Sequence, residues 1–377
     1  MVPKNHSFIA NGIISHNSGK SYSLGVIAEG ISSLPPEIAK NIAVLIFDTM
    51  GIFWTLKYPN VKQRDLLKEW GLEPKAFDPV LYIPLGMFEQ AKSQGLPADV
   101  PFSLLPSDLS VFDWCHAFGF DPMSNPAVLI DRVVGKLREE KKQFSINDIL
   151  SVIESDQKAD QHIKDLVASN FERAKRWGLF GEKATPIADL VQPGKVSIID
   201  ISCYATMPGT WGIRALVIGI VSRRLFMERM AARKLEEYAA IKKTTTFFER
   251  KEKRKMPLVW LFLDEAHEFI PREGKTAASD ALITILREGR QPGISLVLAS
   301  QQPGKIHTDV MTQADVVLAH RLTAKIDVDA LGLLMQSYLR KGLDKEIDDL
   351  PRVKGAAIIF DDTAERLYPM KVRPRMS

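Results

Sequence analysis

Leu258-Val-Trp-Leu-Phe-Leu-Asp-Glu265 is the stretch that decides how this chain folds. Its apolar run is continuous rather than alternating, which predicts a strand buried on both faces, as in a parallel sheet covered by helices. Asp264 and Glu265 follow the run, at the sheet edge where open α/β folds bind their ligands. Asp264 is suited to hold the Mg²⁺ shell, and Glu265 to orient and deprotonate a water molecule. A buried strand followed by a helix-capping aspartate is the structural alternative.

A phosphate-binding loop is indicated by Ser18-Gly19-Lys20-Ser21, which opens a stretch with a helical pattern. Backbone N–H groups at a helix N-terminus hold phosphate, Lys20 reaches the β and γ oxygens, and the Ser21 hydroxyl ligates Mg²⁺. The complete Walker A pattern also requires a glycine five residues before Gly19, where this chain has Ile14. The expected ligands of ATP and Mg²⁺ are therefore Ser18, Gly19, Lys20, Ser21 and Asp264, in a loop whose first half is replaced.

A further polar group, Gln301, directly follows the apolar stretch Ile294-Ser-Leu-Val-Leu-Ala-Ser300, which is predicted to be a strand. An amide beside the two carboxylates can sense the γ-phosphate or position water, so we expect Gln301 to act with Glu265 in catalysis. Arg287 and Arg290 precede the same strand. Such an arginine can reach the phosphate bound by a neighbouring subunit, or it can simply be a helix C-terminal residue favoured by the dipole.

Apolar runs and helical periodicity alternate along most of the chain, which predicts an α/β fold with a mainly parallel sheet and helices on both faces. Residues Thr55 to Ile187 differ, because they are rich in Pro, Gly and charge at first and helical from Asn125 through Trp177. We expect a largely α-helical insertion there. The other predicted strands are Asn41–Asp48, Lys195–Ile201, Asp315–Arg321 and Gly355–Phe360. The predicted core helices are Gly19–Leu34, Trp211–Tyr238 and Thr276–Arg290.

Bulk properties narrow the class of protein. The chain has 377 residues, of which 45% are hydrophobic, enough for one large α/β domain or two smaller ones. Its net charge of +4 permits a nucleic-acid partner without arguing for one, and the basic run Arg250–Lys255 is either a solvated loop or a DNA-contacting patch. Cys115 and Cys203 fit neither a disulfide framework nor a four-ligand zinc site. Without a membrane-length apolar run or a signal-peptide pattern, we expect a cytoplasmic protein and no membrane partner.

The order Ser18-Gly-Lys-Ser21, Leu263-Asp-Glu-Ala-His267, Arg287-Glu-Gly-Arg290 and Ala299-Ser-Gln301 resembles the HerA/FtsK family, specifically the archaeal HerA-like ATPases. The resemblance covers residues from Ser18 to the C-terminus. It implies a RecA-like core, a homo-hexameric ring, duplex DNA threaded through the pore, and a partner nuclease. Carried over by position, it implies an ATP site made of Lys20, Ser21, Asp264, Glu265 and Gln301, with Arg290 as the arginine that acts across the subunit boundary.

Residues 5–17, Asn5-His-Ser-Phe-Ile-Ala-Asn-Gly-Ile-Ile-Ser-His-Asn17, resemble the C-terminal splicing region of an intein, and Ser18 follows. Asn17 would cyclise to cleave its own peptide bond while His16 polarises that carbonyl. Ser18 would accept the upstream segment, and His6 would assist proton transfer. A β-hairpin with incidental histidines is the alternative. Because the motif ends where the Walker A pattern fails, we expect residues 1–17 to be an intein remnant inserted in the phosphate loop, left by a gene model that starts at an internal Met.

The expected domains follow from these boundaries: an intein remnant at 1–17, the first part of the ATPase core at 18–54, the insertion at 55–187, and the rest of the core at 188–377. The leading functional expectation is an ATP-driven DNA translocase or helicase. A protein-transport ATPase related to VirB4 is the first alternative, because it shares the same core. An inactive fragment that binds nucleotide poorly is the second, because half of the phosphate loop is replaced.

Overall fold

A computed structural model gives the fold of this chain. The residues that the structure describes are 12–15, 19–207, 210, 212–245, 256–320, 329, 331–332, 350–351, 353, 355–361 and 366–377; side-chain statements exclude 12–15 and 242–245.

One sheet runs through the described part of the chain, with strand order β10-β9-β8-β1-β7-β6-β2-β5-β3-β4. All neighbours from β8 to β4 are parallel, whereas β9 pairs antiparallel with both β8 and β10. The strands are β1 Gly12–Ser15, β2 Ile42–Asp48, β3 Val80–Pro84, β4 Val100–Phe102, β5 Val196–Asp200, β6 Leu258–Leu263, β7 Ile294–Ser300, β8 Val316–His320, β9 Ala356–Asp361 and β10 Arg366–Lys371.

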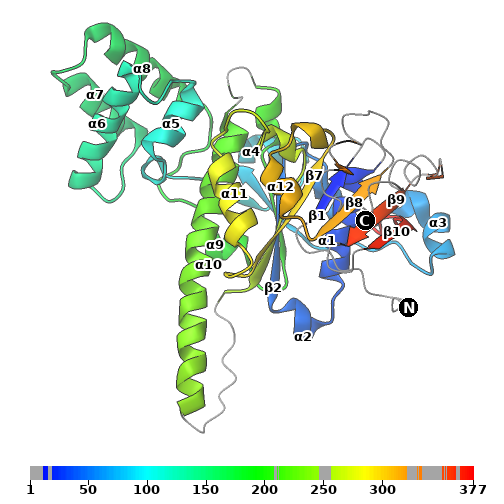
Figure 1. Ribbon diagram of the computed structural model, residues 1–377. Helices are drawn as coiled ribbons and strands as arrows, with labels where there is room; N and C mark the ends of the chain where they lie inside the picture. The colour runs from blue at the N-terminus through cyan, green and yellow to red at the C-terminus, as the bar shows by residue number, and fades with distance from the viewer. Residues whose placement is uncertain are drawn as a thin grey trace.

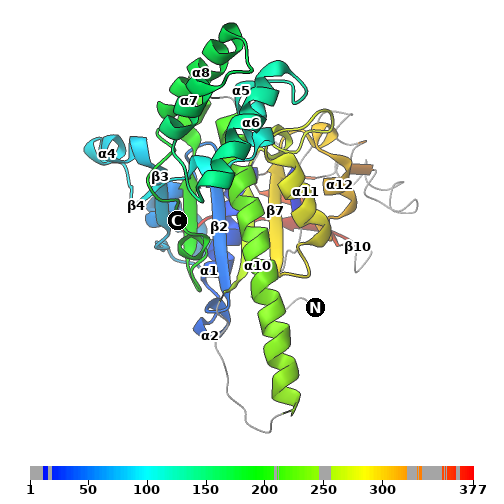
Figure 2. The same ribbon diagram turned by 90° about the vertical axis from the view of Figure 1, so that its left-hand side faces the viewer.

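Helices cover both faces of this sheet, and Figure 2 shows α10 and α11 in front of β2 and β7. The α-helices are α1 Lys20–Ser32, α2 Pro36–Ala39, α3 Arg64–Glu69, α4 Leu85–Ser93, α5 Val111–Phe118, α6 Asn125–Glu140, α7 Ile146–Ser155, α8 Gln161–Lys175, α9 Ile187–Leu190, α10 Ile213–Thr245, α11 Ser279–Glu288 and α12 Thr308–Thr312. The 3₁₀ turns are η1 Phe53–Lys57, η2 Val61–Gln63, η3 Pro106–Asp108, η4 Ser202–Ala205, η5 Ala266–Glu268 and η6 Pro303–Lys305.

The continuous apolar runs are explained by two hydrophobic clusters, one on each face. Along β2, Val44 and Ile46 pack in the same cluster as Leu24 of α1. The residue between them, Leu45, belongs to the other cluster, which includes Leu216 of α10. Because successive side chains of a strand point to opposite faces, a strand covered on both sides needs apolar residues at every position.

The predicted α/β class with a mainly parallel sheet is confirmed. Each predicted strand and core helix has its counterpart in the described residues, from α1 and β2 to β9. Helix α10 continues beyond the expected end at Tyr238 to Thr245, and Trp211 lies outside the described residues. Figures 1 and 2 show that the distal part of α10 projects beyond the sheet. No described helix, α10 included, is both long enough and apolar enough to cross a membrane.

The stretch expected as a largely helical insertion, 55–187, is only partly so. It contains β3 and β4, which extend the core sheet beyond β5, because the short apolar run Leu81–Ile83 fits a buried strand. Its helices are α3, α4 and the group α5 to α8, which Figure 1 shows beside the sheet. An ion pair between Arg223 of α10 and Asp113 of α5, 2.8 Å long, joins this group to the core.

Candidate active site

The predicted site residues meet at the C-terminal edge of the parallel strands. Lys20 and Ser21 begin α1, which follows β1, and Asp264 and Glu265 follow β6. The Ser21 hydroxyl donates a hydrogen bond to the Asp264 carboxylate, although the two residues lie far apart in sequence. A hydroxyl and a carboxylate in contact are the pair that a P-loop site uses to hold Mg²⁺.

Lys20 lies almost completely buried beside the two carboxylates. Burial lowers the pKa of its ammonium group, while the nearby carboxylates of Glu265 and Asp264 act in the opposite direction. Gly19, just before it, has a φ of 150°. That backbone conformation is open to glycine and strained for other residues, so the loop needs glycine at this position.

Glu265 holds an unusual backbone conformation. With a φ of 50° it is the only non-glycine residue with positive φ in the described part of the chain. Its N–H donates to Asp264 Oδ1 over 2.8 Å, which fixes the turn after β6. A non-glycine residue in this region costs about 1–3 kcal/mol, and such strain is concentrated at functional sites.

The Glu265 carboxylate is oriented on one oxygen and unsatisfied on the other. The Gln301 side-chain amide donates to Oε1, while Oε2 is buried without a hydrogen-bond partner. Burial, and then the adjacent Asp264, raise the pKa of Glu265, while Gln301 and Lys20 oppose this rise. A carboxylate with a raised pKa and one free buried oxygen can accept a proton from water, as a general base must.

Two histidines at this edge were not predicted as site residues. His267 Nδ1 lies 3.2 Å from the Ser300 hydroxyl and 3.6 Å from Glu265 Oε2, so its ring borders the unsatisfied oxygen. Burial lowers the pKa of His267, which favours the neutral ring. The sequence did give a reason to consider His267, because it ends the Leu-Asp-Glu-Ala-His segment.

His320, the second histidine, lies beneath the phosphate loop at the end of β8. Its Nδ1 is 3.1 Å from the Ala356 carbonyl, which can only accept, so Nδ1 carries the proton. In the neutral ring, which burial favours by lowering the pKa of His320, Nε2 then accepts from the Ser23 hydroxyl over 2.9 Å. A Cβ on Gly19 would lie 3.8 Å from the His320 ring. In the sequence, His320 could have been recognised as a site residue because it is a polar residue at the end of an apolar strand.

The two arginines do not join the site within one chain. Arg287 forms an ion pair with Asp309, with Nε 2.6 Å from Oδ2. Arg290 is exposed and lies between α11 and the first residue of β7. Because β7 is parallel to β6, Arg290 lies at the opposite edge of the sheet from Glu265, about 20 Å away along the strands.

The residues present fit ATP and Mg²⁺. No group of three or more His, Cys, Asp or Glu side chains that could hold a metal occurs in the described segments. Mg²⁺ at a phosphate site needs only one or two protein ligands, because phosphate oxygens and water complete its octahedron. Ser21 and Asp264 would supply those ligands, Lys20 would supply a positive charge for phosphate, and Glu265 Oε2 is a buried acceptor without a hydrogen-bond partner.

The splicing residues predicted from sequence, His6, His16, Asn17 and Ser18, lie outside the described residues. The backbone of Gly12–Ser15 is described, as β1. This strand lies between β7 and β8 and is parallel to both, so it leads directly towards the phosphate loop.

The sequence matches a family model described as "Helicase HerA, central domain" over residues 18–207. A curated relative from Pyrococcus furiosus, "DNA double-strand break repair helicase HerA", is 28% identical over 196 residues, which are 48% of this chain and 34% of the relative. A "probable" helicase of the same name from Methanocaldococcus jannaschii is 34% identical over 92 residues, 24% of this chain and 17% of the relative. The chain thus spans about a third or less of the length of these relatives.

Among solved structures, VirB4 of Thermoanaerobacter pseudethanolicus is similar with a TM-score of 0.56 and 11% identity, over 96% of this chain and 88% of that one. The bacterial conjugative coupling protein TrwB, in its unbound form, gives a TM-score of 0.54 and 12% identity over 97% and 88% of the two chains. At these identities the likeness shows a shared fold and nothing more.

Proposed function

The chain belongs to the family of the HerA helicase central domain, and from this premise we propose that it is an ATP-hydrolysing translocase or helicase that acts on DNA. The observation that carries the proposal is the site itself. One sheet edge brings together a buried lysine, a hydroxyl–carboxylate pair, and a buried glutamate oriented by an amide.

Each residue of this chain has a defined role in the proposed reaction. Lys20 binds the β- and γ-phosphate oxygens, and Ser21 with Asp264 holds Mg²⁺, which supplies positive charge to the phosphates when it is bound. Glu265 takes a proton from the attacking water at its free Oε2. Gln301 keeps the Glu265 carboxylate oriented through Oε1.

The substrate and the assembly are further parts of the proposal. Curated relatives are named as DNA double-strand break repair helicases, and we carry this over to propose duplex DNA as the partner of this chain. We propose a homo-hexamer in which Arg290 reaches the site of a neighbouring subunit, because in its own chain it lies at the wrong edge of the sheet. Arg287, paired with Asp309, would support the same interface, and a partner nuclease remains part of the family expectation.

Residues 1–17 are proposed, from sequence alone, to be an intein remnant. Asn17 would then cleave its own peptide bond slowly and release a fragment beginning at Ser18. Intact-mass spectrometry after long incubation would detect this fragment, and Asn17→Ala would abolish it. If no fragment forms under any condition, and Asn17→Ala behaves as the unchanged chain, the remnant has no splicing chemistry.

ATP hydrolysis with and without duplex DNA tests the proposed function. With Mg²⁺ present, we expect DNA to stimulate turnover, and Lys20→Ala to abolish it in both conditions. The alternative of a VirB4-like protein-transport ATPase, which shares the fold, predicts hydrolysis that does not respond to DNA. The alternative of an inactive fragment predicts neither hydrolysis nor measurable nucleotide binding.

A further inference from the structure

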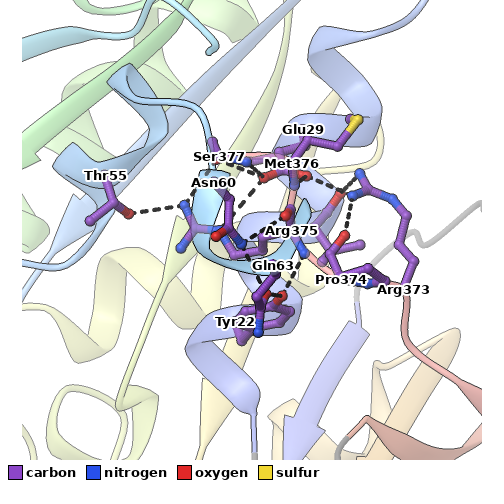
Figure 3. Close-up of polar contacts among 12 residues, drawn as sticks. Tyr22, Glu29, Thr55, Asn60, Gln63, Arg373, Pro374, Arg375, Met376 and Ser377 are labelled. Carbon is purple, nitrogen blue, oxygen red and sulfur yellow. Dashed lines mark hydrogen bonds and ion pairs between the residues drawn. The ribbon is translucent and has the colours of Figure 1, made fainter. Parts of the chain in front are cut away.

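Residues Arg373–Ser377, here called the strap, leave the sheet after β10 and lie against the phosphate-loop helix α1. Figure 3 shows the strap between α1 and the segment that carries Thr55 and Asn60. The residues from Pro374 onward are buried, Arg375 included, and the other arginine of the strap, Arg373, is partly buried. Arginine is seldom buried unless its charge is paired, so a partner for these side chains is needed on the neighbouring elements.

Glu29, in the C-terminal part of α1, is that partner. Its side chain is completely buried, and all the hydrogen bonds that its carboxylate accepts within the described chain come from the strap. Arg373 Nη1 donates over 2.7 Å, the Ser377 hydroxyl over 2.6 Å, and the backbone N–H groups of Met376 and Ser377 over 3.0 Å. Arg375 Nε lies 3.6 Å away. The carboxylate and the strap thus pair each other's polar groups where both are removed from water, so each needs the other in order to be buried.

The strap backbone makes a further contact with α1, at Tyr22, and also contacts the segment on its other side. Its Arg375 N–H donates to the Tyr22 hydroxyl over 2.6 Å, which in turn donates to Gln63. The Met376 carbonyl accepts from the N–H groups of Asn60 and Lys75 over 2.8 and 2.9 Å. The strap therefore joins α1 to the η1–η2 segment that follows β2, and it contacts α1 directly after Lys20 and Ser21.

Gly25 provides independent evidence that α1 is adapted to the strap. A glycine inside a helix destabilises the helix relative to alanine. A Cβ at this position would lie 2.8–3.0 Å from Nε, Cζ and Cδ of Arg375, which is closer than real contacts allow. The buried Arg375 side chain would therefore have to shift if residue 25 were alanine. Gly30 in the same helix has nothing within 4 Å of such a Cβ.

We propose that the strap positions the phosphate-loop helix, and that Glu29 is a positioning residue for nucleotide binding. Glu29 lies about 13 Å along the helix axis from Lys20, so it acts on bound phosphate only through the placement of α1. Lys20 and Ser21 lie in the first turn of α1, so a shift of this helix would move both residues away from the bound phosphates and weaken nucleotide binding. Only the kinetic test of this proposal rests on the proposed ATPase function.

The first test compares Gly25→Ala with Gly30→Ala by hydrogen exchange. Helix propensity alone predicts slower exchange of the α1 amides in both variants. A displaced strap predicts the reverse for Gly25→Ala, with α1 amides exchanging about tenfold faster than in Gly30→Ala while α6–α8 stay unchanged. Equal exchange in the two variants would show that the strap does not hold α1.

The second test removes the strap and adds it back. In a chain that ends at Val372, we expect the KM for ATP to rise about tenfold with kcat within about twofold, and the peptide Arg-Pro-Arg-Met-Ser to reverse the change. Glu29→Gln should weaken peptide binding at least about tenfold, whereas Glu37→Gln, on the exposed surface of α2, should not. Failure of the truncated chain to bind the peptide, with its circular dichroism spectrum intact, would overturn the proposal. Peptide binding without any ATPase activity would instead contradict the proposed function.

Discussion

At the scale of single residues, the site depends most on Glu265. Its left-handed backbone, its buried position and its contact with Gln301 leave Oε2 as a free acceptor beside the Ser21–Asp264 pair. Its raised pKa has burial as the first cause and Asp264 as the second. All of these features suit a group that takes a proton from water, and none is required to hold the phosphates.

Glu265→Gln is therefore expected to lower kcat at least about 100-fold and to leave the Kd for ATP within about twofold. The amide keeps the shape and the hydrogen bond with Gln301 but cannot accept the proton. Steady-state hydrolysis and a nucleotide titration measure the two quantities. Glu268→Gln, three residues on and paired with Arg214, is the matched control and should remain active. Near-normal turnover by Glu265→Gln would remove Glu265 from the role of base.

Asp48 gives a prediction about pH and stability. It ends β2 at the same sheet edge, and burial, then the neighbouring Asp200, raise its pKa from 3.8 to about 6. Between these values the folded state binds more protons than the unfolded state, so the free energy of unfolding falls as pH rises through this window. The stabilising contribution is complete below pH 3.8 and lost above about pH 6.

Asp48→Asn should remove this fall, because the amide does not titrate. Denaturant unfolding of both proteins between pH 4 and pH 8 measures it. We expect the unchanged chain to lose stability relative to Asp48→Asn as the pH rises to about 6, and the difference to be constant above that. A difference that is independent of pH would mean that Asp48 titrates normally.

At the scale of elements, the sequence predicted most strands of the core from their apolar runs and missed strands whose apolar run is short or interrupted. Strand β3 is short, and β10 contains Pro369 and pairs on one side only, so its residues are largely exposed. Asp264, Glu265 and Gln301 could be predicted together because parallel strands place their C-terminal ends at one edge. The place of His320 could not, since it depends on β8 lying beside β1. The strap could not be predicted either, because its sequence has no periodic pattern.

The entry to the phosphate loop gives the prediction at this scale. Strand β1 leads towards Gly19 with Ile14 at the position where the Walker A pattern has glycine. A β-branched residue resists the curled backbone that surrounds a β-phosphate. We expect Ile14→Gly, which completes the pattern, to tighten ATP binding at least about tenfold. Ile13→Gly, in the same strand, is the control and should not. Tight ATP binding by the unchanged chain would show that the loop works without the glycine.

At the scale of the whole molecule, the proposed ring is what would bring Arg290 to an active site. Arg290 is exposed and lies at the opposite sheet edge from Glu265, so a single chain cannot bring the two together. A neighbouring subunit can, since in a closed ring the same surface pair repeats at every interface. Each active site would then combine the loop of one subunit with the arginine of the next.

Mixing two inactive variants tests this arrangement. Arg290→Ala and Lys20→Ala proteins should each lack activity, and mixed oligomers should recover part of it, because some interfaces then combine an intact loop with an intact arginine. Hydrolysis is measured over a range of mixing ratios. Arg287→Ala serves as the comparison, since its pairing with Asp309 predicts a smaller loss. No recovery at any ratio, with ring formation shown, would assign Arg290 to another role.

We propose that ATP hydrolysis at this site moves the protein along duplex DNA, and displacement of a third strand from a DNA triplex measures such movement. With ATP and Mg²⁺, we expect the Ile14→Gly protein to release the triplex-forming strand, and the same protein with Glu265→Gln to bind DNA without releasing it. DNA-stimulated hydrolysis without any release of the third strand would contradict the account, because the energy of ATP would then be used without movement along the duplex.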